Sequence, residues 1–423
     1  MREMKDSGVE WIGEIPVDWK LNKIKHHFSI SSGTTPKSDE PEYWDGDIVW
    51  ITPADFKTDD VYVSDVHRNL SQEGYRVSSL QLVPAGSIIF SKRAPIGQVV
   101  INAIDLCTNQ GCLTAVLNDD SDVRFYRYVM SIATEEFELA GSGTTFKEIS
   151  ATSFGNILLP LTSKQEQTKC ADYLDVKSSK IDEIIEKQQA IIEKLKEYKL
   201  SIITEAVTSG INPDVEMKDS GSVWFGSIPI NWQMKRLKHV FHIQKDIAGE
   251  EGHTVLSITQ RGIIPKDFSN NEGQFANSYA NYQLVHKGDF AMNHMDLLTG
   301  WVDISKYEGV TSPDYRVFVL NDKNGMCPKY YLYMMQMCYS ARIFYGLGQG
   351  VSGMGRWRLQ ADKFLNFHIP IPPYDEQKII ADYITDKVNH IEVEIDKRNK
   401  LIEKYQEYKK SLIYEVVTGK KEV

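Results

Sequence analysis

The sequence predicts a mixed α/β (α+β) fold: two globular domains in a pseudo-two-fold arrangement, separated by two long helices that form an antiparallel coiled coil. The first observation behind this prediction is an internal repeat, because residues 166–208 of the 423-residue chain align without a gap with residues 376–418. The second is that each copy joins a region of short β-branched runs to a long segment with heptad-like apolar spacing. The two copies are offset by 210 residues, since residue 166 aligns with residue 376. A period this long is typical of a tandem duplication, whereas solenoid repeats span about 20–50 residues.

Each copy also begins with the same motif, Trp-x-Gly-x-Ile-Pro-x-x-Trp, at residues 11–19 and again at residues 224–232. We expect this motif to be a structural anchor that packs both of its tryptophans into the base of each globular domain. The repeat predicts four segments, which are two globular domains at residues 1–162 and 211–373 and two spacer helices at residues 163–210 and 374–423.

Short apolar runs bounded by glycine, proline or aspartate predict the strands of the first globular region. A helical stretch follows these strands and is broken by Gly141 and Gly143. The predicted elements are, in order, strands at residues 47–51, 86–90 and 98–101, a helix at residues 122–138, and a last strand at residues 156–160.

The first long helix is predicted to begin with a capping box, in which the Ser163 hydroxyl and the Glu166 carboxylate satisfy free backbone N–H groups. The helix is predicted to end at Ser209-Gly210. Gln188 occupies a position in the stripe of this helix that would otherwise be apolar. The predicted stripe consists of Ile181, Ile184, Ile191, Leu195, Tyr198 and Ile202.

The second long helix is predicted to begin after Pro372-Pro373 and to end at Thr418-Gly419. Because both stripes are narrow and similarly spaced, we expect the two helices to pack on each other. The alternative is that each helix folds back on its own globular region. The second predicted stripe consists of Ile391, Ile395, Leu401, Ile402, Tyr405, Tyr408 and Leu412.

The second globular region, residues 217–370, shares its beginning and its end with the first region but little in between. Where the first region has Ser32-Gly33-Thr34-Thr35-Pro36-Lys37, the second has Gln244-Lys245-Asp246-Ile247-Ala248-Gly249. The sequence therefore predicts two similar helices that carry two different globular heads.

The charge of the chain restricts its possible partners. The net charge is −10, which argues against non-specific binding of phosphates over the whole surface. The charge is uneven, because residues 1–160 carry 14 Lys and Arg against 23 Asp and Glu, whereas residues 217–370 carry 16 against 13. The second globular region is therefore the better electrostatic candidate for an anionic partner.

Other features of composition indicate a cytoplasmic protein with no membrane contact. The sequence contains no apolar run of about 18 residues and no signal peptide. Its five cysteines are scattered and form no Cys-x-x-Cys pair, so that neither a disulfide framework nor a zinc site is expected. A reducing compartment fits this usage best.

The enzyme-like motifs of the chain are incomplete. Ile371-Pro372-Pro373-Tyr374 lacks the Asn or Asp with which the similar loop of amino-methyltransferases accepts hydrogen bonds from the target amino group. Gly346-Leu347-Gly348-Gln349-Gly350 does not follow a clear strand, which favours a turn over a cofactor loop. Neither a phosphate-binding loop nor a nuclease motif after Pro313-Asp314 is present. We therefore expect no catalytic residue, no metal site and no cofactor in this chain.

Signals for DNA contact occur in polar and basic loops of both globular regions. Arg and Gln side chains are suited to reading base edges, whereas Lys, Ser and Thr side chains position phosphates. The segment Arg356-Trp357-Arg358 is the best signal, because two guanidinium groups flank an aromatic ring in a glycine-rich loop. The candidates are Thr34, Thr35, Lys37, Lys57, Lys92, Arg93 and Lys147 in the first region, and Gln260, Arg261, Lys266, His294, Arg356, Trp357 and Arg358 in the second.

In this order, and twice, these motifs resemble one family, the DNA-specificity subunit of type I restriction-modification enzymes, usually called HsdS. The resemblance covers nearly the whole chain. It rests on Trp11-x-Gly13-x-Ile15-Pro16-x-x-Trp19, on Ser32-Gly33-Thr34-Thr35-Pro36 with Tyr43-Trp44 and Ile48-Val49-Trp50-Ile51, and on the helix starts Pro160…Glu166-Gln167 and Pro370-Ile371-Pro372-Pro373…Glu376-Gln377. The second region departs from the family's Ser-Gly-x-Thr-Pro pattern, so no contact residue is transferred to it by motif.

The resemblance implies two target-recognition domains, each of which reads one half of a split, asymmetric DNA sequence, and helices that act as a spacer. It implies as partners double-stranded DNA, two modification (methyltransferase) subunits and restriction (translocase/nuclease) subunits. The chain itself would be a non-catalytic subunit. Adenine-N6 methylation would use S-adenosylmethionine in the modification subunits, and translocation with cleavage would use ATP and Mg in the restriction subunits. Two alternatives remain, an autonomous DNA-modifying enzyme with unrecognised catalytic motifs and a two-headed protein-binding scaffold.

Overall fold

The computed structural model of this protein describes residues 2–56, 61–64, 66, 68–143, 147–268, 276–350 and 357–423. The chain divides into two compact units, of which the first unit comprises Met1–Gln188 with Lys400–Val423 and the second comprises Gln189–Asn399. Each unit therefore contains one globular head, the beginning of one long helix and the end of the other. We call residues 2–161 the first head and residues 217–371 the second head.

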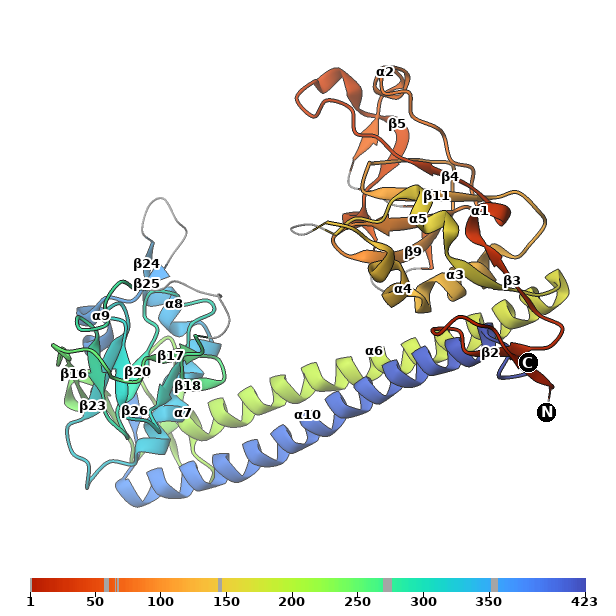
Figure 1. Ribbon diagram of the computed structural model, residues 1–423. Helices are drawn as coiled ribbons and strands as arrows, with labels where there is room; N and C mark the ends of the chain where they lie inside the picture. Colours follow the sequence, from red (N-terminus) through yellow and green to blue (C-terminus); the bar gives the residue numbers. More distant parts are fainter. Residues whose placement is uncertain are drawn as a thin grey trace. The chain divides into compact units, whose positions relative to one another are not determined.

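The first head is built on a five-stranded sheet, which Figure 1 shows in orange with helices α3 and α4 beside it. The strand order is β4 (Phe28–Ser32), β11 (Cys112–Leu117), β8 (Ile88–Lys92), β9 (Ile96–Asn102) and β6 (Tyr62–Val63), and neighbours are antiparallel except β6 and β9. A smaller sheet holds β10 (Cys107–Thr108), β5 (Trp44–Ile51) and β7 (Asn69–Leu70). Two further pairs are β1 (Met4–Asp6) with β2 (Glu14–Pro16), and β3 (Lys20–Lys23) with β12 (Leu158–Leu161).

The helices of the first head agree with the predicted helical stretch but divide it. Asp122 caps α3 by accepting a hydrogen bond of 3.0 Å from the backbone N–H of Arg124. The helix predicted at residues 122–138 is broken after Ile132, and a second helix then ends at the predicted glycine break. The helices are α1 (Ile24–His27), α2 (Gln72–Val77), α3 (Val123–Ile132), α4 (Thr134–Ala140) and α5 (Ala151–Asn156), with short 3-10 turns η1 (Pro41–Tyr43) and η2 (Pro53–Asp55).

The second head is built on a four-stranded antiparallel sheet in the order β16 (Phe241–Gln244), β23 (Arg316–Leu320), β20 (Phe290–Met292) and β21 (Val302–Ile304). Strand pairs surround it: β13 (Met217–Asp219) with β14 (Ser227–Pro229), β15 (Gln233–Arg236) with β26 (His368–Ile371), β17 (Leu256–Thr259) with β18 (Gly262–Pro265), β19 (Gln283–Val285) with β22 (Gly309–Thr311), and β24 (Gln349–Gly350) with β25 (Trp357–Arg358). Its helices are η3 (Leu237–His239), α7 (Pro328–Ser340), α8 (Ile343–Leu347) and α9 (Ala361–Asn366).

The two heads share one core although their sequences differ between the repeated ends. The strand order β4-β11-β8-β9 corresponds to β16-β23-β20-β21, and in both heads the first strand begins with a buried phenylalanine, Phe28 or Phe241. Phe28 pairs with Leu117 and Phe241 pairs with Leu320, which fixes the correspondence of β11 and β23 residue by residue. The duplication predicted from the helices therefore includes the cores of the two heads. In these cores the residues of both copies are apolar, although most of the amino acids differ.

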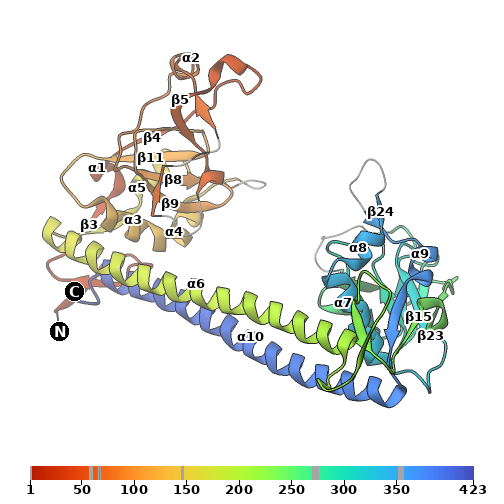
Figure 2. The ribbon, with the colours of Figure 1, turned by 180° about the vertical axis from the view of Figure 1, so that it is seen from behind.

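The two long helices are α6 (Lys164–Ser209) and α10 (Tyr374–Val417). In both units they lie side by side (Figures 1 and 2). In the first unit, Cys170 is near Val416 and the Asp182 carboxylate binds Lys409 Nζ at 2.6 Å, so the helices run antiparallel. In the second unit, Lys199 Nζ binds the Glu392 carboxylate at 2.6 Å. The predicted pairing of the two helices is confirmed within each unit.

The apolar seam of these helices differs in part from the predicted stripe. Tyr198 and Tyr408 are 58% and 53% exposed, and Leu401 is also exposed, so these three predictions are wrong. Ile192, rather than Ile191, is buried in the first helix. Adjacent residues lie about 100° apart around a helix. Only one of two neighbouring apolar residues can therefore face the seam, and the sequence does not show which one. The buried or half-buried seam positions follow a strict heptad spacing, Leu174, Ser178, Ile181, Ile185, Gln188, Ile192, Leu195, Lys199, Ile202 and Ala206.

The motif at the start of each copy packs on the end of the other copy's helix. In the first unit, the Ile12 carbonyl accepts a hydrogen bond of 2.9 Å from Tyr414 Oη, and Gly419 contacts Pro16 so closely that a Cβ atom there would lie 2.5 Å from the proline ring. In the second unit, Gly210 lies near Trp232 and Pro229, although less tightly, since a Cβ atom there would lie 3.4 Å from the indole ring. Each unit is therefore closed by a helix end that comes from the other copy.

The anchoring role predicted for the tryptophans holds for one tryptophan of each motif. Trp19 and Trp232 are fully buried, whereas Trp224 is 41% exposed and Trp11 is only half-buried. The prediction that both tryptophans enter the base of the head is wrong for Trp224, which lies against Gly346 at the surface. Position 19 or 232 faces the joint between head and helix, which explains its burial.

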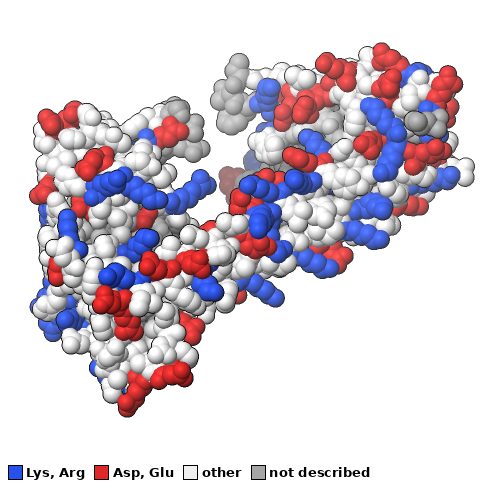
Figure 3. Space-filling model, turned by 90° about the horizontal axis from the view of Figure 1, so that it is seen from below, with Lys and Arg blue, Asp and Glu red and all other residues white. Residues whose placement is uncertain are grey.

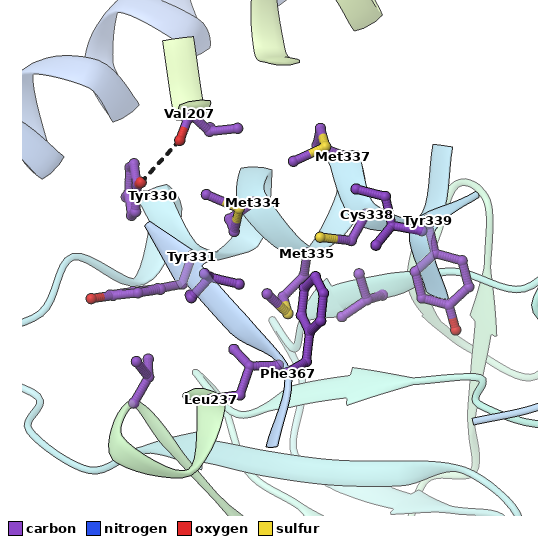
Figure 4. Packing of buried hydrophobic residues seen from close by; sticks show 14 of the residues in the cluster. Val207, Leu237, Tyr330, Tyr331, Met334, Met335, Met337, Cys338, Tyr339 and Phe367 are labelled. Atoms are coloured by element: carbon purple, nitrogen blue, oxygen red, sulfur yellow. Dashed lines mark hydrogen bonds between the residues drawn. The ribbon is translucent and has the colours of Figure 1, made fainter. Parts of the chain in front are cut away.

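The core of the second head continues directly into the helix end. Figure 4 shows Tyr330 of α7 pointing at Val207 of α6, whose carbonyl accepts a hydrogen bond of 3.2 Å from the Tyr330 hydroxyl. Met334, Met335 and Phe367 pack beside this contact. Because the same cluster contains α6, α10 and head residues, the head is rigidly joined to the helices within its unit.

The predicted capping box at the start of α6 is present in part. The Ser163 hydroxyl accepts a hydrogen bond of 3.3 Å from the backbone N–H of Glu166. The Glu166 carboxylate, however, accepts a hydrogen bond of 2.6 Å from Arg2. The equivalent carboxylate of the second copy, Glu376, accepts one of 3.0 Å from the indole N–H of Trp232. Both carboxylates thus tie the start of a copy to its own long helix.

Candidate nucleic-acid interface

Candidate residues of both heads gather at one edge of the central sheet. In the first head this edge is where β4 and β8 end and β11 begins, and Thr34, Lys92 and Arg93 lie just there. In the second head β16 and β20 end and β23 begins at the corresponding edge, which carries His294. Antiparallel neighbours bring the end of one strand beside the start of the next, so loops distant in sequence meet at this edge.

The polar loop of the first head is held against the end of β10 and against Gln110, which follows this strand. The backbone N–H of Thr34 donates to the Thr108 carbonyl at 3.0 Å, and the Thr35 hydroxyl hydrogen-bonds the Gln110 side chain. Gly33 is required here, because a Cβ atom at this position would lie 2.0 Å from the Thr108 carbonyl oxygen. The loop is thereby fixed in shape rather than left free at the surface.

Tryptophans of β5 hold the rest of this loop. The indole N–H of Trp50 donates to the Thr34 carbonyl and that of Trp44 donates to the Lys37 carbonyl, both at 3.1 Å. The Lys37 side chain is exposed. The Arg68 guanidinium, which sequence analysis missed, lies 3.7 Å from the centre of the Trp44 ring. A lone arginine beside a short strand carried no sequence signal for this contact.

The basic candidates of the first head are partly neutralised. Lys92 Nζ lies 2.8 Å from the Glu148 carboxylate, and Arg93 lies 3.9 Å from the same carboxylate. Lys147 is exposed beside Glu148. One carboxylate is therefore shared by two of the three cations, so that it balances only part of the positive charge at this edge. Lys57 lies outside the described residues.

In the second head, His294 and Arg358 come together with a residue that sequence analysis missed, Arg316. All three line a cavity of about 570 Å³, together with Lys245, Gln283 and Tyr315. Arg316 and His294 are each only 5% exposed. An arginine at the start of the apolar strand β23 was the available signal, because a charge next to a buried apolar run is costly to bury.

The electrostatics of this cavity are unusual. The Arg316 guanidinium donates one hydrogen bond of 2.8 Å to the Leu359 carbonyl and lies over the Phe364 ring. Burial lowers the pKa of Arg316 to about 10, so that it remains charged at neutral pH. Burial, with Arg316 and Arg358 nearby, lowers the pKa of His294 to about 3, which keeps this imidazole neutral.

The other described candidates of the second head do not line this cavity. The Trp357 ring lies beside the Tyr345 ring in a tilted arrangement, with ring centres 4.9 Å apart, and is partly exposed. Gln260 and Arg261 form the exposed turn between β17 and β18, and Lys266 follows β18. Gln260 lines a different groove, of about 490 Å³, with Lys196 and Lys199 of α6. Arg356 lies outside the described residues.

The charged surface is mixed rather than uniformly basic. On the face drawn in Figure 3, Lys and Arg side chains alternate with Asp and Glu side chains. A mixed surface favours contact through local sites over attraction to a whole basic face.

The described residues contain no group of His, Cys, Asp and Glu with the geometry of a metal site. All five cysteines are free, and burial raises the pKa of the Cys107 thiol to about 11 and that of the Cys170 thiol to about 12. Within the described ranges, no helix combines the length and the apolar character that crossing a bilayer requires.

Comparison with known families gives one result. Residues 16–198 and 229–404 each match the family model described as the type I restriction modification DNA specificity domain. The two matched segments together span well over half of the chain, and each covers most of one head and most of the helix that follows it.

Among known proteins, the chain is 32% identical over 243 residues to the type I restriction enzyme MjaIX specificity subunit of Methanocaldococcus jannaschii, an alignment covering 55% of this chain and 54% of that subunit. It is 25% identical over 323 residues to the MjaVIII specificity subunit of the same organism, covering 72% and 71%. The chain thus spans about half the length of the first of these relatives.

A solved structure shares the fold. It comes from work on complex assembly and conformational transition of the type I R-M system, and it superimposes with a TM-score of 0.69 at 12% identity, covering 95% of this chain and 98% of that one. At this identity the likeness concerns the fold alone.

Proposed function

We propose that this chain, which belongs to the type I restriction modification DNA specificity family, is the DNA-recognition subunit of such an enzyme and that each head reads one half of a bipartite, asymmetric target. The observation that carries the proposal is the contrast at the sheet edge. Both heads have the same core, but one edge presents a Lys–Glu pair and a fixed polar loop, and the other presents a buried-arginine cavity. Two readers with one scaffold and different edges suit two different half-sites.

In this proposal α6 and α10 are the spacer that sets the unread gap and the platform on which two modification subunits dock. The continuity of both helices, of 46 and 44 residues, supports the spacer role. The repeated outward side chains Tyr198 and Tyr408, exposed in both units, support docking of two copies of one partner.

The chain would itself be non-catalytic. S-adenosylmethionine would be bound by the modification subunits, and ATP with Mg by restriction subunits. The incomplete enzyme motifs of the sequence support this assignment. Double-stranded DNA is the proposed ligand of the assembled complex, in which partner subunits also contact the phosphates.

Replacement of one head tests the proposal. Residues 30–160 are exchanged for the matching segment of a relative with a different target, and methylated adenines are mapped in cells that carry the chain and its modification subunit. One half-site should change while the other half and the gap stay the same. The matched control exchanges the second head and should change only the other half.

Three results would count against the proposal. A change in both half-sites after one exchange would contradict independent readers. Methyl transfer by the purified chain alone would favour an autonomous modifying enzyme. Failure of the reconstituted complex to retain any DNA sequence-specifically would favour a protein-binding scaffold.

A further inference from the structure

The cavity of the second head has an unbalanced set of charges. Lys245, Arg316 and Arg358 line it together with the neutral His294, and none of the described residues that line it carries a carboxylate. Two nearby acids, Asp296 and Asp314, act on Tyr315 only through space and do not line the cavity. Asp296 accepts hydrogen bonds from the backbone of Leu298 and Thr299, which commits it to its own turn.

Two buried polar atoms in this cavity have no hydrogen-bond partner within the described part of the chain. They are Nη1 of Arg316 and Nδ1 of His294. Removing a charged guanidinium from water costs several kcal/mol, and the described contacts of Arg316 are the neutral Leu359 carbonyl and the Phe364 ring. A partner that accepts hydrogen bonds and carries negative charge would offset this cost, because it would face a permanent cation.

The first head has, at the position that corresponds to this cavity, a set of residues whose charges are balanced. The registers of the paired strands match Arg316 with Leu113, which is buried and apolar. The Lys92 carbonyl accepts a hydrogen bond from Ile149 N–H at 3.0 Å, as the His294 carbonyl does from Leu359 N–H at 2.9 Å. His294 therefore corresponds to Lys92.

It follows that Arg358, which precedes Leu359, corresponds to Glu148, which precedes Ile149. The first head closes this position with the Lys92–Glu148 ion pair at 2.8 Å. In the second head the acid is replaced by a base, and the apolar residue behind it is replaced by a buried arginine. These two exchanges turn an internally neutral position into an open cationic one.

We propose that this cavity is a phosphate-binding site, in which Arg316 and Arg358 hold one backbone phosphate of the DNA half-site that the second head reads. The inference rests on the proposed function for the source of the phosphate, while the chemistry of the site rests on the cavity alone. Guanidinium groups suit this ligand because they form charge-assisted, often bidentate hydrogen bonds with phosphate oxygens. The contact fixes the register of the second head on the duplex without reading a base.

The test uses the full chain reconstituted with its modification subunit and a duplex that contains the target. Arg358→Glu reproduces the residue of the first head at an exposed site, and Arg316→Leu reproduces its buried one. Lys323→Glu, at the opposite end of β23, is the control because it makes the same charge change on the same head. We expect Arg358→Glu and Arg316→Leu to weaken binding by roughly tenfold to a hundredfold and to reduce the salt dependence by about one phosphate contact.

Single methylphosphonate substitutions locate the phosphate. Substitution at one position of the second half-site should weaken DNA binding by the native complex as much as Arg358→Glu does. The same substitution should not weaken DNA binding by the Arg358→Glu variant any further. Because Arg316→Leu can disturb folding, Arg358→Glu, whose side chain is exposed, keeps the test decisive.

Each outcome separates the site from the proposed function. Specific DNA binding by the native complex with unchanged affinity and salt dependence in Arg358→Glu overturns the phosphate site and leaves the function standing. Saturable binding of inorganic phosphate that Arg358→Glu abolishes, without any change in DNA binding, makes the cavity a small-anion site and overturns the DNA source. No specific DNA binding by the native complex overturns the proposed function itself.

Discussion

At the residue scale, the joint between head and helix depends on one tryptophan per copy. Trp19 packs with Val416 and Val417, and Trp232 packs with Ala206 and Val207. The indole N–H of Trp232 also donates to Glu376 at 3.0 Å. The Trp232 side chain thus links the start of the second copy to α10, the helix of the same copy, and to the end of α6, the helix of the first copy.

Replacement of Trp232 should therefore destabilise the second unit. We expect Trp232→Ala to lower the free energy of unfolding by about 3–5 kcal/mol, because it leaves a large cavity and removes the hydrogen bond from the indole to Glu376. Trp224→Ala, in the same motif but at an exposed site, should cost less than about 1 kcal/mol. Chemical denaturation followed by tryptophan fluorescence measures both changes. Equal losses would show that the motif is stabilised as a whole rather than through position 232.

The sequence indicated some residues of the cavity in the second head but not all of them. His294 and Arg358 were selected from sequence and lie in one cavity. Arg316 was missed because a strand residue gives no signal of whether its charge is paired. Gln260 was selected from sequence together with these residues but lines a separate groove. The composition of a loop does not indicate where the loop lies in space.

At the element scale, the long helices show how a repeat stabilises itself. The seam follows heptad spacing over α6 and again over α10, where Ile391, Ile395, Ile402 and Leu412 are buried. Polar residues interrupt it, including Lys199 and Lys409, which bind carboxylates of the facing helix in the second and the first unit respectively. Such residues tie the helices to one register at some cost in stability.

The corrected seam makes a prediction for neighbouring residues of α6. Ile192→Ala should lower the free energy of unfolding by about 2–5 kcal/mol, since it removes a buried side chain from the seam. Tyr198→Ala, at a predicted but exposed position, should change it by less than about 0.5 kcal/mol. Thermal denaturation followed by circular dichroism distinguishes the two. The opposite ranking would restore the stripe that the sequence first suggested.

Tyr198→Ala has a second use at this scale. Tyr198 and Tyr408 occupy equivalent positions of the two helices, and both are exposed. Loss of modification-subunit binding in a stable Tyr198→Ala variant would therefore support the docking role proposed for the helices. Unaltered stoichiometry and affinity in the double Tyr198→Ala, Tyr408→Ala variant would remove it.

At the scale of the whole molecule, the chain is organised by exchange of helix ends between its two copies. The first unit needs residues 400–423, and the second needs the end of α6, so neither copy contains a complete unit. A head with only its own helix would leave Trp19 or Trp232 without its cover. The duplication is therefore structural as well as functional, because each copy completes the other.

The spacer proposal predicts the effect of lengthening both helices together. Insertion of one seven-residue heptad after Gln188 and another after Asn399 keeps the seam in register and adds roughly 10 Å to each helix. The unread gap of the target should grow by about 3 base pairs, since B-DNA rises 3.4 Å per pair, while both half-sites stay the same. Mapping of methylated adenines measures this change. Insertion in α6 alone is the control and should abolish assembly; full activity with an unchanged gap in the paired variant would refute the spacer.

By itself the sequence determined the duplication, the two long helices, the family and the main strands of the first head, because these depend on spacing and local propensity along the chain. Only the tertiary structure decided which tryptophan is buried, which of two adjacent apolar residues enters the seam, and that each unit is closed by the other copy's helix. It alone placed Arg316 beside His294 and Arg358. These features depend on contacts between residues far apart in sequence. Whether a side chain is buried, or whether a charge lacks a partner, is decided only when the chain folds and brings those residues together.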